Sequence, residues 1–192
     1  MSAWSIARSE LILGGQKSGK SRRAELLAQH WIAQSPGNRA MLLATGQAWD
    51  EEMRARIARH QEDRARRAPG LVTVEEPCRL AEALRQHDDA GTLLVVDCLT
   101  LWLTNRMMPA QGSGDSPAAL TDAIAGLIRA IEGAASPIVL VGNEIGLGVI
   151  PLGSEVRAFV DALGRLNQAV AASCRRVTLM VAGLPLTLKD ES

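Results

Sequence analysis

One short stretch near the start of the chain has the residue types and spacing that hold a nucleoside triphosphate. Gly14–Ser21 reads G-G-Q-K-S-G-K-S and fits G-x-x-x-x-G-K-[ST], the pattern of a phosphate-binding P-loop. Its glycines permit a tight turn whose N–H groups point at phosphate oxygens, and the dipole of a following helix adds to the attraction. We expect Lys20 to reach the terminal phosphates and the Ser21 hydroxyl to ligate Mg²⁺.

The residues on either side of the motif supply the context that it requires. Leu11–Leu13 is an apolar strand, and a helix runs from Ser21 to about Gln34, before Pro36 and Gly37. A glycine-rich turn that matches the pattern by chance would not be expected to lie between an apolar strand and a helix. The sequence therefore predicts a nucleoside triphosphate site.

Strand and helix signals alternate along the rest of the chain. Strands that are apolar throughout and separated by helices indicate an α/β protein, with a mostly parallel sheet covered by helices on both faces. We expect a single nucleotide-binding domain over residues 11–192 and a loose extension over residues 1–10. The predicted strands are Leu11–Leu13, Ala40–Ala44, Leu71–Val74, Thr92–Val96, Ile138–Val141, Val177–Ala182 and a short extended piece, Leu186–Lys189. The predicted helices span residues 21–34, 50–67, 79–86, 99–107, 118–131 and 154–173.

Composition limits the classes of partner. The chain has 192 residues with 21 basic and 21 acidic side chains, so no overall field attracts nucleic acid or an anionic membrane. Its apolar runs are too short to span a bilayer. Cys78, Cys98 and Cys174 lie far apart without metal or redox spacing, and reduced thiols in the cytoplasm are the simplest interpretation.

Asp97 follows the apolar run Leu93–Val96, as the acid of a Walker B element does. The carboxyl ends of parallel strands form the ligand crevice, where this acid could hold Mg²⁺ beside Ser21. A buried strand can also end in Asp as a helix cap, but the P-loop favours the metal role. Other loops expected at the same crevice are residues 44–46, residues 143–148 and Gly183, which can equally be plain connections.

A basic helix raises a sharper hypothesis. Arg56, His60 and Arg64 recur every four residues and so share one helical face. Two guanidiniums beside an imidazole would suit a triphosphate and would keep the imidazole neutral and nucleophilic. The alternative is a solvated basic helix with an incidental histidine, and spacing alone favours that alternative. Trp49 and Trp102 could stack on a flat substrate or serve as core residues.

Several segments together resemble one family. They are G-G-Q-K-S-G-K-S, R-I-x-x-H at 56–60, D-C-L-T-L-W-L-T-N at 97–105, N-E-I-G-L-G-V-I-P at 143–151 and G-R-L-N-Q at 164–168. In this order they are similar to the bifunctional adenosylcobinamide kinase/adenosylcobinamide-phosphate guanylyltransferases of cobalamin biosynthesis. The similarity runs from about Leu11 to Lys189. The P-loop alone is generic, whereas the other four segments in combination are specific.

The resemblance implies a RecA-like P-loop fold and two activities. A nucleoside triphosphate, ATP or GTP, phosphorylates adenosylcobinamide, and GMP is then transferred from GTP to adenosylcobinamide phosphate through a covalent guanylyl-histidine. The family histidine corresponds to His60. The resemblance therefore favours His60 as the nucleophile over an incidental histidine on a solvated basic helix. The resemblance also implies a homo-oligomer, commonly a trimer. The implied nucleotide contacts are Gly14, Gly15, Gln16, Lys17, Ser18, Gly19, Lys20, Ser21, Ala44, Thr45, Gly46, Gln61, Glu62, Asp63, Arg64, Glu75 and Asp97, with Ser21 and Asp97 at Mg²⁺.

Two other functions use the same P-loop without guanylyl transfer. One is a small-molecule kinase in which His60 is structural. The other is a regulatory NTPase, although Asn143–Gly146 is not the N-K-x-D that small GTPases use to read guanine.

Overall fold

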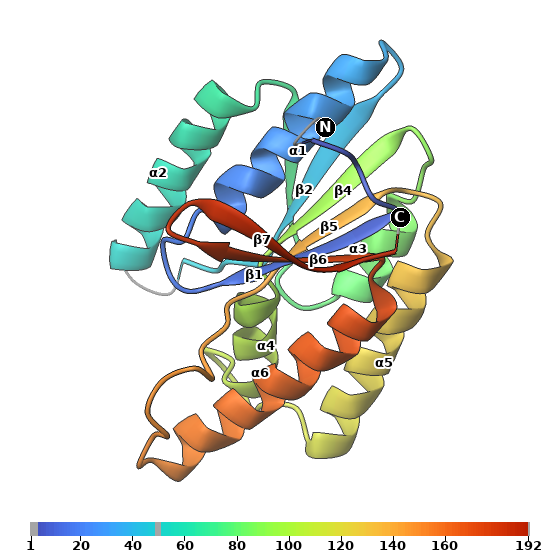
Figure 1. Cartoon of the computed structure of the whole chain (residues 1–192). Helices are drawn as coiled ribbons and strands as arrows, with labels where there is room; N and C mark the ends of the chain where they lie inside the picture. The colour runs from blue at the N-terminus through green and yellow to red at the C-terminus, as the bar shows by residue number, and fades with distance from the viewer. Residues whose placement is uncertain (1–3, 49–50, 192) are drawn as a thin grey trace.

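The computed structural model describes residues 4–48 and 51–191, whose strands join in one seven-stranded sheet (Figure 1). The strands are β1 (Ser9–Gly14), β2 (Arg39–Ala44), β3 (Leu71–Glu75), β4 (Thr92–Asp97), β5 (Ile138–Val141), β6 (Arg176–Val181) and β7 (Leu184–Asp190). The helices are α1 (Lys20–Gln34), α2 (Glu51–Arg67), α3 (Leu80–Gln86), α4 (Leu99–Met107), α5 (Pro117–Gly133) and α6 (Ser154–Ser173). Each predicted element is present, with ends that shift by at most two residues.

The sheet order is β3-β2-β4-β5-β1-β6-β7, and every pairing is parallel except that of β6 with β7. The final piece begins at Leu184, two residues earlier than predicted, because a tight turn at Ala182 and Gly183, both with positive φ, returns the chain beside β6. The P-loop strand β1 lies between β5 and β6, with its carboxyl end pointing the same way as those of β2 to β5. A mostly parallel α/β sheet is thereby confirmed.

Apolar side chains fill both faces of the sheet, as continuous apolar strands require. On one face the leucines of β1, β4 and β5 pack against α3, α4, α5 and α6. On the other face the sheet packs against Ala24, Leu27 and Ala28 of α1. Trp102 is 2% exposed in the first cluster and its Nε1 donates to the Cys78 carbonyl oxygen at 2.9 Å. It is therefore a core residue rather than a stacking platform, while Trp49 lies outside the described residues.

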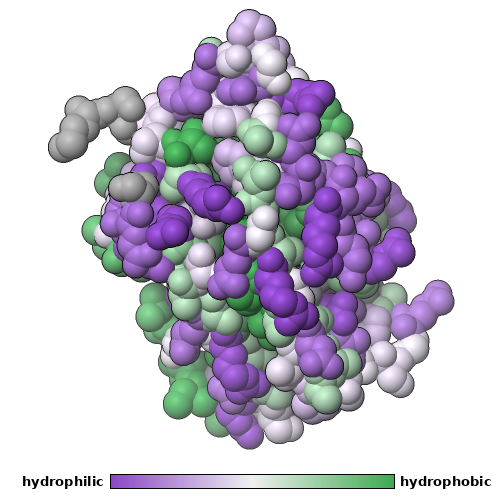
Figure 2. All heavy atoms as spheres, turned by 90° about the vertical axis from the view of Figure 1, so that its right-hand side faces the viewer, coloured by the Kyte–Doolittle hydropathy of each residue, from purple (hydrophilic) through white to green (hydrophobic). Residues whose placement is uncertain are grey.

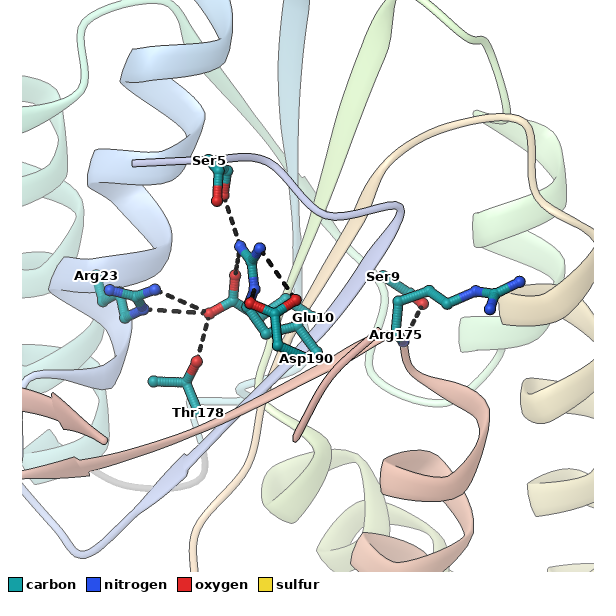
Figure 3. A network of polar contacts seen from close by, with 8 residues as sticks. Ser5, Ser9, Glu10, Arg23, Arg175, Thr178 and Asp190 are labelled. Atoms are coloured by element: carbon teal, nitrogen blue, oxygen red, sulfur yellow. Dashed lines mark hydrogen bonds and ion pairs between the residues drawn. The ribbon is translucent and has the colours of Figure 1, made fainter. Parts of the chain in front are cut away.

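The prediction of a loose extension over residues 1–10 is wrong for residues 4–10. β1 already begins at Ser9, and Trp4 and Ile6 pack against the cluster that includes α1. Glu10 is 1% exposed, and its carboxylate accepts hydrogen bonds from Arg23 and from Thr178 (Figure 3). A buried carboxylate needs such partners to offset its lost hydration, so this network fixes the start of the first strand.

Arg176 extends the same network. Its guanidinium lies 3.6 Å from Glu10 and 3.3 Å from Asp190, and its Nη1 donates to the Ser5 carbonyl oxygen at 2.8 Å. Because these partners come from both ends of the chain, the first and last strands are held together beside α1 (Figure 3).

Hydrophilic side chains cover much of the surface on the right in Figure 1, as Figure 2 shows. Exposed apolar side chains gather instead in the segment between β5 and α6, where Leu147, Val149 and Leu152 are 84%, 96% and 98% exposed. None of the described helices is both long and apolar enough to cross a membrane.

Candidate active site at the carboxyl end of the sheet

The P-loop turn joins β1 to α1 in a backbone shape that only small residues permit at two positions. Gly14 has φ +149° and Gly19 has φ +99°. A Cβ on Gly14 would lie 2.4 Å from the Met180 carbonyl oxygen of β6, so no larger residue fits there. Lys17 also has positive φ, at 57°. The turn is thus folded as a cradle rather than as an extended loop.

Lys20 is placed over this cradle. It is the first residue of α1 and is 7% exposed. Its Nζ donates to the Gly15 carbonyl oxygen at 2.5 Å and lies 3.5 Å from the Ser18 Oγ. The ammonium therefore lies among the groups that would surround a phosphate, next to the positive end of the helix dipole.

Neighbouring strand ends hold the cradle in shape. The Glu144 N–H, after β5, donates to the Gly14 carbonyl oxygen at 3.1 Å. The Gly183 N–H, after β6, donates to the Ser18 carbonyl oxygen at 3.1 Å. Two of the loops that the sequence left open as plain connections thus fix the P-loop backbone from either side.

The ends of β2 and β4 are locked together by Thr45, which is fully buried. Its hydroxyl donates to the Cys98 carbonyl oxygen at 2.7 Å and accepts from the Cys98 N–H at 2.8 Å. The Thr45 N–H also donates to the Asp97 carbonyl oxygen at 3.1 Å. Because the Thr45 side chain is committed to Cys98, this residue sets the position of Asp97 rather than offering its hydroxyl to a ligand.

Two asparagines that the sequence did not single out for a role hold the site loops. Asn105, in the last turn of α4, donates to the carbonyl oxygens of Thr45 at 2.8 Å and Pro77 at 3.0 Å. Asn167, on α6, donates to the Asn143 carbonyl oxygen at 3.1 Å. Both are buried. A buried amide on an otherwise apolar helix face is the available sequence signal, but its partners lie far away in sequence.

Cys98 has the setting of a structural thiol. Burial, followed by the neighbouring Asp97 carboxylate, raises the pKa of the Cys98 thiol to about 12. The thiolate that nucleophilic chemistry requires is therefore absent near neutral pH, which supports the interpretation of Cys98 as a small apolar residue.

Helix α2 contains the predicted nucleophile. The backbone of Arg56 and His60 belongs to this helix, but their side chains lie outside the described residues. Gln61, Glu62 and Asp63 follow and are exposed. The helix that the sequence predicts over residues 50–67 is therefore present from Glu51, and its first turn carries the acids Glu51 and Glu52.

Arg64 does not lie on an exposed cationic face. It is 9% exposed, donates to the Thr73 Oγ1 at 3.1 Å and lies 3.8 Å from the Glu25 carboxylate. Arg67 joins the same carboxylate at 2.9 Å. Burial raises the pKa of Glu25 although both guanidiniums oppose the rise. Arg64 therefore anchors α2 to α1 and β3, because a helix packed on one side turns its inward arginine to the buried acid.

Ser21 and Asp97 fit the donor set that Mg²⁺ prefers. Both supply oxygen, the ligand type of hard cations, and Mg²⁺ commonly takes one or two protein groups together with water and substrate phosphates. Across residues 4–48 and 51–191, no group of three or more His, Cys, Asp or Glu could hold a metal ion. A metal here would therefore depend on the nucleotide for part of its coordination.

A cavity of about 490 Å³ opens beside the ends of β2 and β3. Gly46 and Glu75 line it from those strand ends, and Ile57 lines it from α2. Its volume lies within the range of about 300–1,000 Å³ that is typical of small-molecule sites. The cavity thus brings together two of the predicted nucleotide contacts and the helix that carries His60.

Comparison with known proteins decides the family. The family model described as cobinamide kinase / cobinamide phosphate guanyltransferase matches residues 10–188. The chain belongs to this family. It is accordingly an enzyme with kinase and guanylyltransferase activities, and cobinamide and its phosphate are its substrates.

Named relatives agree over almost the whole chain. The bifunctional adenosylcobalamin biosynthesis protein CobP of Pseudomonas aeruginosa is 49% identical over 95% of this chain and 98% of its own length. The CobU protein of Salmonella typhimurium is 34% identical and that of Escherichia coli 32%, each over 93% of this chain and 98% of its own length. These names confirm cobalamin biosynthesis as the setting of the enzyme.

A solved structure supports the fold alone. The flagellar accessory protein FlaH of Methanocaldococcus jannaschii superposes with a TM-score of 0.53 at 12% identity, covering 96% of this chain and 80% of that one. Together with the sheet order and the P-loop, this likeness confirms the predicted RecA-like α/β fold.

Proposed function

We propose that this enzyme phosphorylates the aminopropanol hydroxyl of adenosylcobinamide and then transfers GMP from GTP to the resulting phosphate through a guanylyl-histidine at His60. The products are adenosylcobinamide-GDP and pyrophosphate. The observation that carries the proposal is the shared cavity, where Ile57, three positions before His60 on α2, meets Gly46 and Glu75.

The kinase step relies on the cradle and Lys20. ATP or GTP would place its phosphates against the P-loop N–H groups, with the Lys20 ammonium beside the terminal phosphate. The oxygen of the substrate hydroxyl attacks that phosphorus and forms a new P–O bond, the P–O bond to the nucleoside diphosphate breaks, and the hydroxyl proton passes to water. Catalysis here is mainly positioning and neutralisation of charge, since the protein forms no covalent bond.

The guanylyl step requires a nucleophile on the protein. The imidazole nitrogen of His60 attacks the α-phosphorus of GTP, an N–P bond forms, and pyrophosphate leaves. An oxygen of adenosylcobinamide phosphate then attacks the same phosphorus and the imidazole leaves with its electron pair restored. Splitting one displacement in two is the usual advantage of covalent catalysis.

Mg²⁺ would be held by the Ser21 hydroxyl and the Asp97 carboxylate and would neutralise phosphate charge when bound. We also assign the remaining predicted nucleotide contacts to these two steps: residues 14–20 to the triphosphate, and Ala44, Gly46, residues 61–63 and Glu75 to the guanine nucleotide near α2. Thr45 would act by holding Asp97 in position. Arg64 is kept only as an anchor for α2.

The experiment is labelling with GTP that carries ³²P in its α-phosphate. We expect acid-labile, base-stable label on the wild-type protein and none on His60→Ala. The chain has three histidines, so His30→Ala and His87→Ala are matched controls that should keep the label. Label retained on His60→Ala would refute the assignment. Absence of label from the wild-type protein would favour a plain kinase.

We further propose a homo-oligomer, a trimer by resemblance. Exposed Leu184 and Leu186 on the outermost strand β7 support it, because large exposed apolar side chains on an edge strand favour contact with another chain. Sedimentation equilibrium of the purified protein should give a multiple of the 20.5 kDa chain mass. A monomeric mass at micromolar concentration would contradict it.

A further inference from the structure

A second large cavity lies on the opposite side of the P-loop strand from the one beside α2. It has a volume of about 480 Å³ and lies between α6, the last two strands and the segment after β5. Its apolar walls come from Leu13, Leu147, Ala171, Val177 and Leu188. We call it the α6 groove.

One end of the α6 groove lies beside the start of the P-loop. Leu13, in its wall, directly precedes Gly14 in the chain. Glu144, also in its wall, donates its N–H to the Gly14 carbonyl oxygen at 3.1 Å. A molecule in this groove would therefore lie next to the cradle that receives the triphosphate.

The rim of the groove extends its apolar surface outward. Leu147 and Leu188 are 84% and 57% exposed, and the neighbouring Val149 and Ile150 are 96% and 78% exposed. An apolar surface of this kind beside a polar site is typical of ligand or partner binding. In Figure 1 the segment between β5 and α6 and the start of α6 project at the lower left, below the P-loop.

Polar groups in the groove suit the N–H groups of amides. Gln168 and Glu144 line it, and both side chains carry oxygens that accept hydrogen bonds, although the Glu144 Oε1 already accepts the Gly146 N–H at 2.9 Å. Asn167 lines it as well, but it is buried and its amide donates to the Asn143 carbonyl oxygen, so it shapes the wall rather than offering an acceptor. The Lys189 ammonium is directed to the carbonyl oxygens of Ala171 and Ala172, at 3.3 and 3.1 Å. The groove therefore presents acceptors within an apolar lining.

Cobinamide has the complementary chemistry. Its macrocycle carries methyl groups on both faces and primary amides on its arms, and it is too large for the P-loop itself. Gly46 and Glu75, two of the predicted nucleotide contacts, already line the other cavity. The α6 groove is therefore the cavity available to the acceptor cobinamide. The hydroxyl of cobinamide must come within about 3.5 Å of the terminal phosphorus.

We propose that the α6 groove and its apolar rim bind the corrin macrocycle of the acceptor. The ring lies against Leu147 and Leu188, its amide arms donate to Gln168 and Glu144, and its aminopropanol arm reaches past Leu13 to the cradle. The inference rests on the proposed function, since it takes the two-step transfer to cobinamide as given.

The test compares Leu147→Asp and Leu188→Asp with the wild-type protein. Both side chains are largely exposed, so each variant should fold normally. We expect the Kd for cobinamide, titrated by its visible absorbance without nucleotide, to rise about tenfold or more, because a charge replaces apolar contact area. The KM for cobinamide in the kinase reaction should rise in parallel. The KM for ATP should stay within about twofold.

Val72→Asp is the matched control. Val72 is 56% exposed on β3, the opposite edge strand of the sheet, so the same kind of charge is added away from the groove. It should leave cobinamide binding within about twofold of wild type. Unchanged cobinamide affinity in both groove variants would overturn the proposal. So would a fall in their sedimentation mass, because a second copy of the chain would then cover this face.

The two hypotheses fail separately. If the wild-type protein forms no labelled histidine but loses cobinamide affinity in the groove variants, the histidine mechanism fails and the groove assignment stands. If label forms at His60 and the groove variants bind cobinamide as the wild type does, only the groove assignment fails.

Discussion

Lys20 is the single residue on which the described site depends most. Its ammonium already contacts the Gly15 carbonyl oxygen and lies near the Ser18 hydroxyl, so little rearrangement is needed when phosphate arrives. Such preorganised charge is usually the largest contribution that a protein makes to phosphoryl transfer.

Lys20→Ala should therefore lower kcat for cobinamide phosphorylation by on the order of 10²–10³-fold. The measurement is transfer of label from γ-labelled ATP to cobinamide. Gln29→Ala, an exposed change further along α1, is the control and should keep wild-type activity. A Lys20→Ala enzyme with activity within a few-fold of wild type would show that the cradle is not the phosphate site.

Cys98 and Cys174 give a pH prediction at the same scale. Burial is the main cause that raises the pKa of each thiol from 9.0 to about 12. Above pH 9 the unfolded chain loses these protons and the folded chain keeps them. The free energy of unfolding should therefore fall as pH rises from 9 toward 12. Below pH 9 the two buried thiols make their full contribution to stability. Urea unfolding of wild type and of the Cys98→Ala/Cys174→Ala variant should show a shallower decline in the variant. Equal slopes would contradict burial of the thiols.

Among the elements, α4 does more than cover the sheet. Its last turn carries Asn105, whose amide holds the carbonyl oxygens of Thr45 and Pro77, and so ties together the loops after β2 and β3. Gly46 and Pro77 from these loops line the cavity next to α2.

Asn105→Leu should lower the free energy of unfolding by about 2 kcal/mol, since two buried carbonyl oxygens lose their donor. The KM for GTP in the guanylyl step should rise as well, because the loops at the cavity are no longer tied. Denaturant unfolding and steady-state kinetics measure the two effects. Asn38→Leu is the control: Asn38 donates to the Trp31 carbonyl oxygen at 2.8 Å, away from the site. Loss of the Asn38 amide should lower stability without changing the KM for GTP. An unchanged KM in Asn105→Leu would show that Asn105 has only a structural role.

Local signals in the sequence could predict the elements and the P-loop, because apolar runs, glycines and helix ends act within a few residues. Local signals could not predict which face of α2 packs against α1 and β3. Arg64 was expected beside a nucleotide, but it reaches Glu25 on α1 and Thr73 on β3, and this depends on how three separate elements meet. Asn105 and Asn167 were missed for the same reason, since their carbonyl partners lie 24 to 60 residues away.

Across the whole molecule, the fold class could be predicted but the order of strands could not. The placement of β1 between β5 and β6 is set by contacts between distant segments. The start of the chain illustrates this. Residues 1–10 carry few local signals and were expected to be loose, yet Glu10 is fixed by Thr178 and Arg176 from the last part of the sheet.

At this scale the chain combines the P-loop turn, a cavity beside α2 and the α6 groove on a single sheet. We propose that a guanylyl group held by His60 is an intermediate between GTP and cobinamide phosphate. Isolated protein carrying the α-phosphate label, freed of GTP, can be mixed with cobinamide phosphate. We predict that the label leaves the protein and appears in cobinamide-GDP in equal amount. Label that stays on the protein, or is released as free GMP while no cobinamide-GDP forms, would contradict a guanylyl-histidine intermediate.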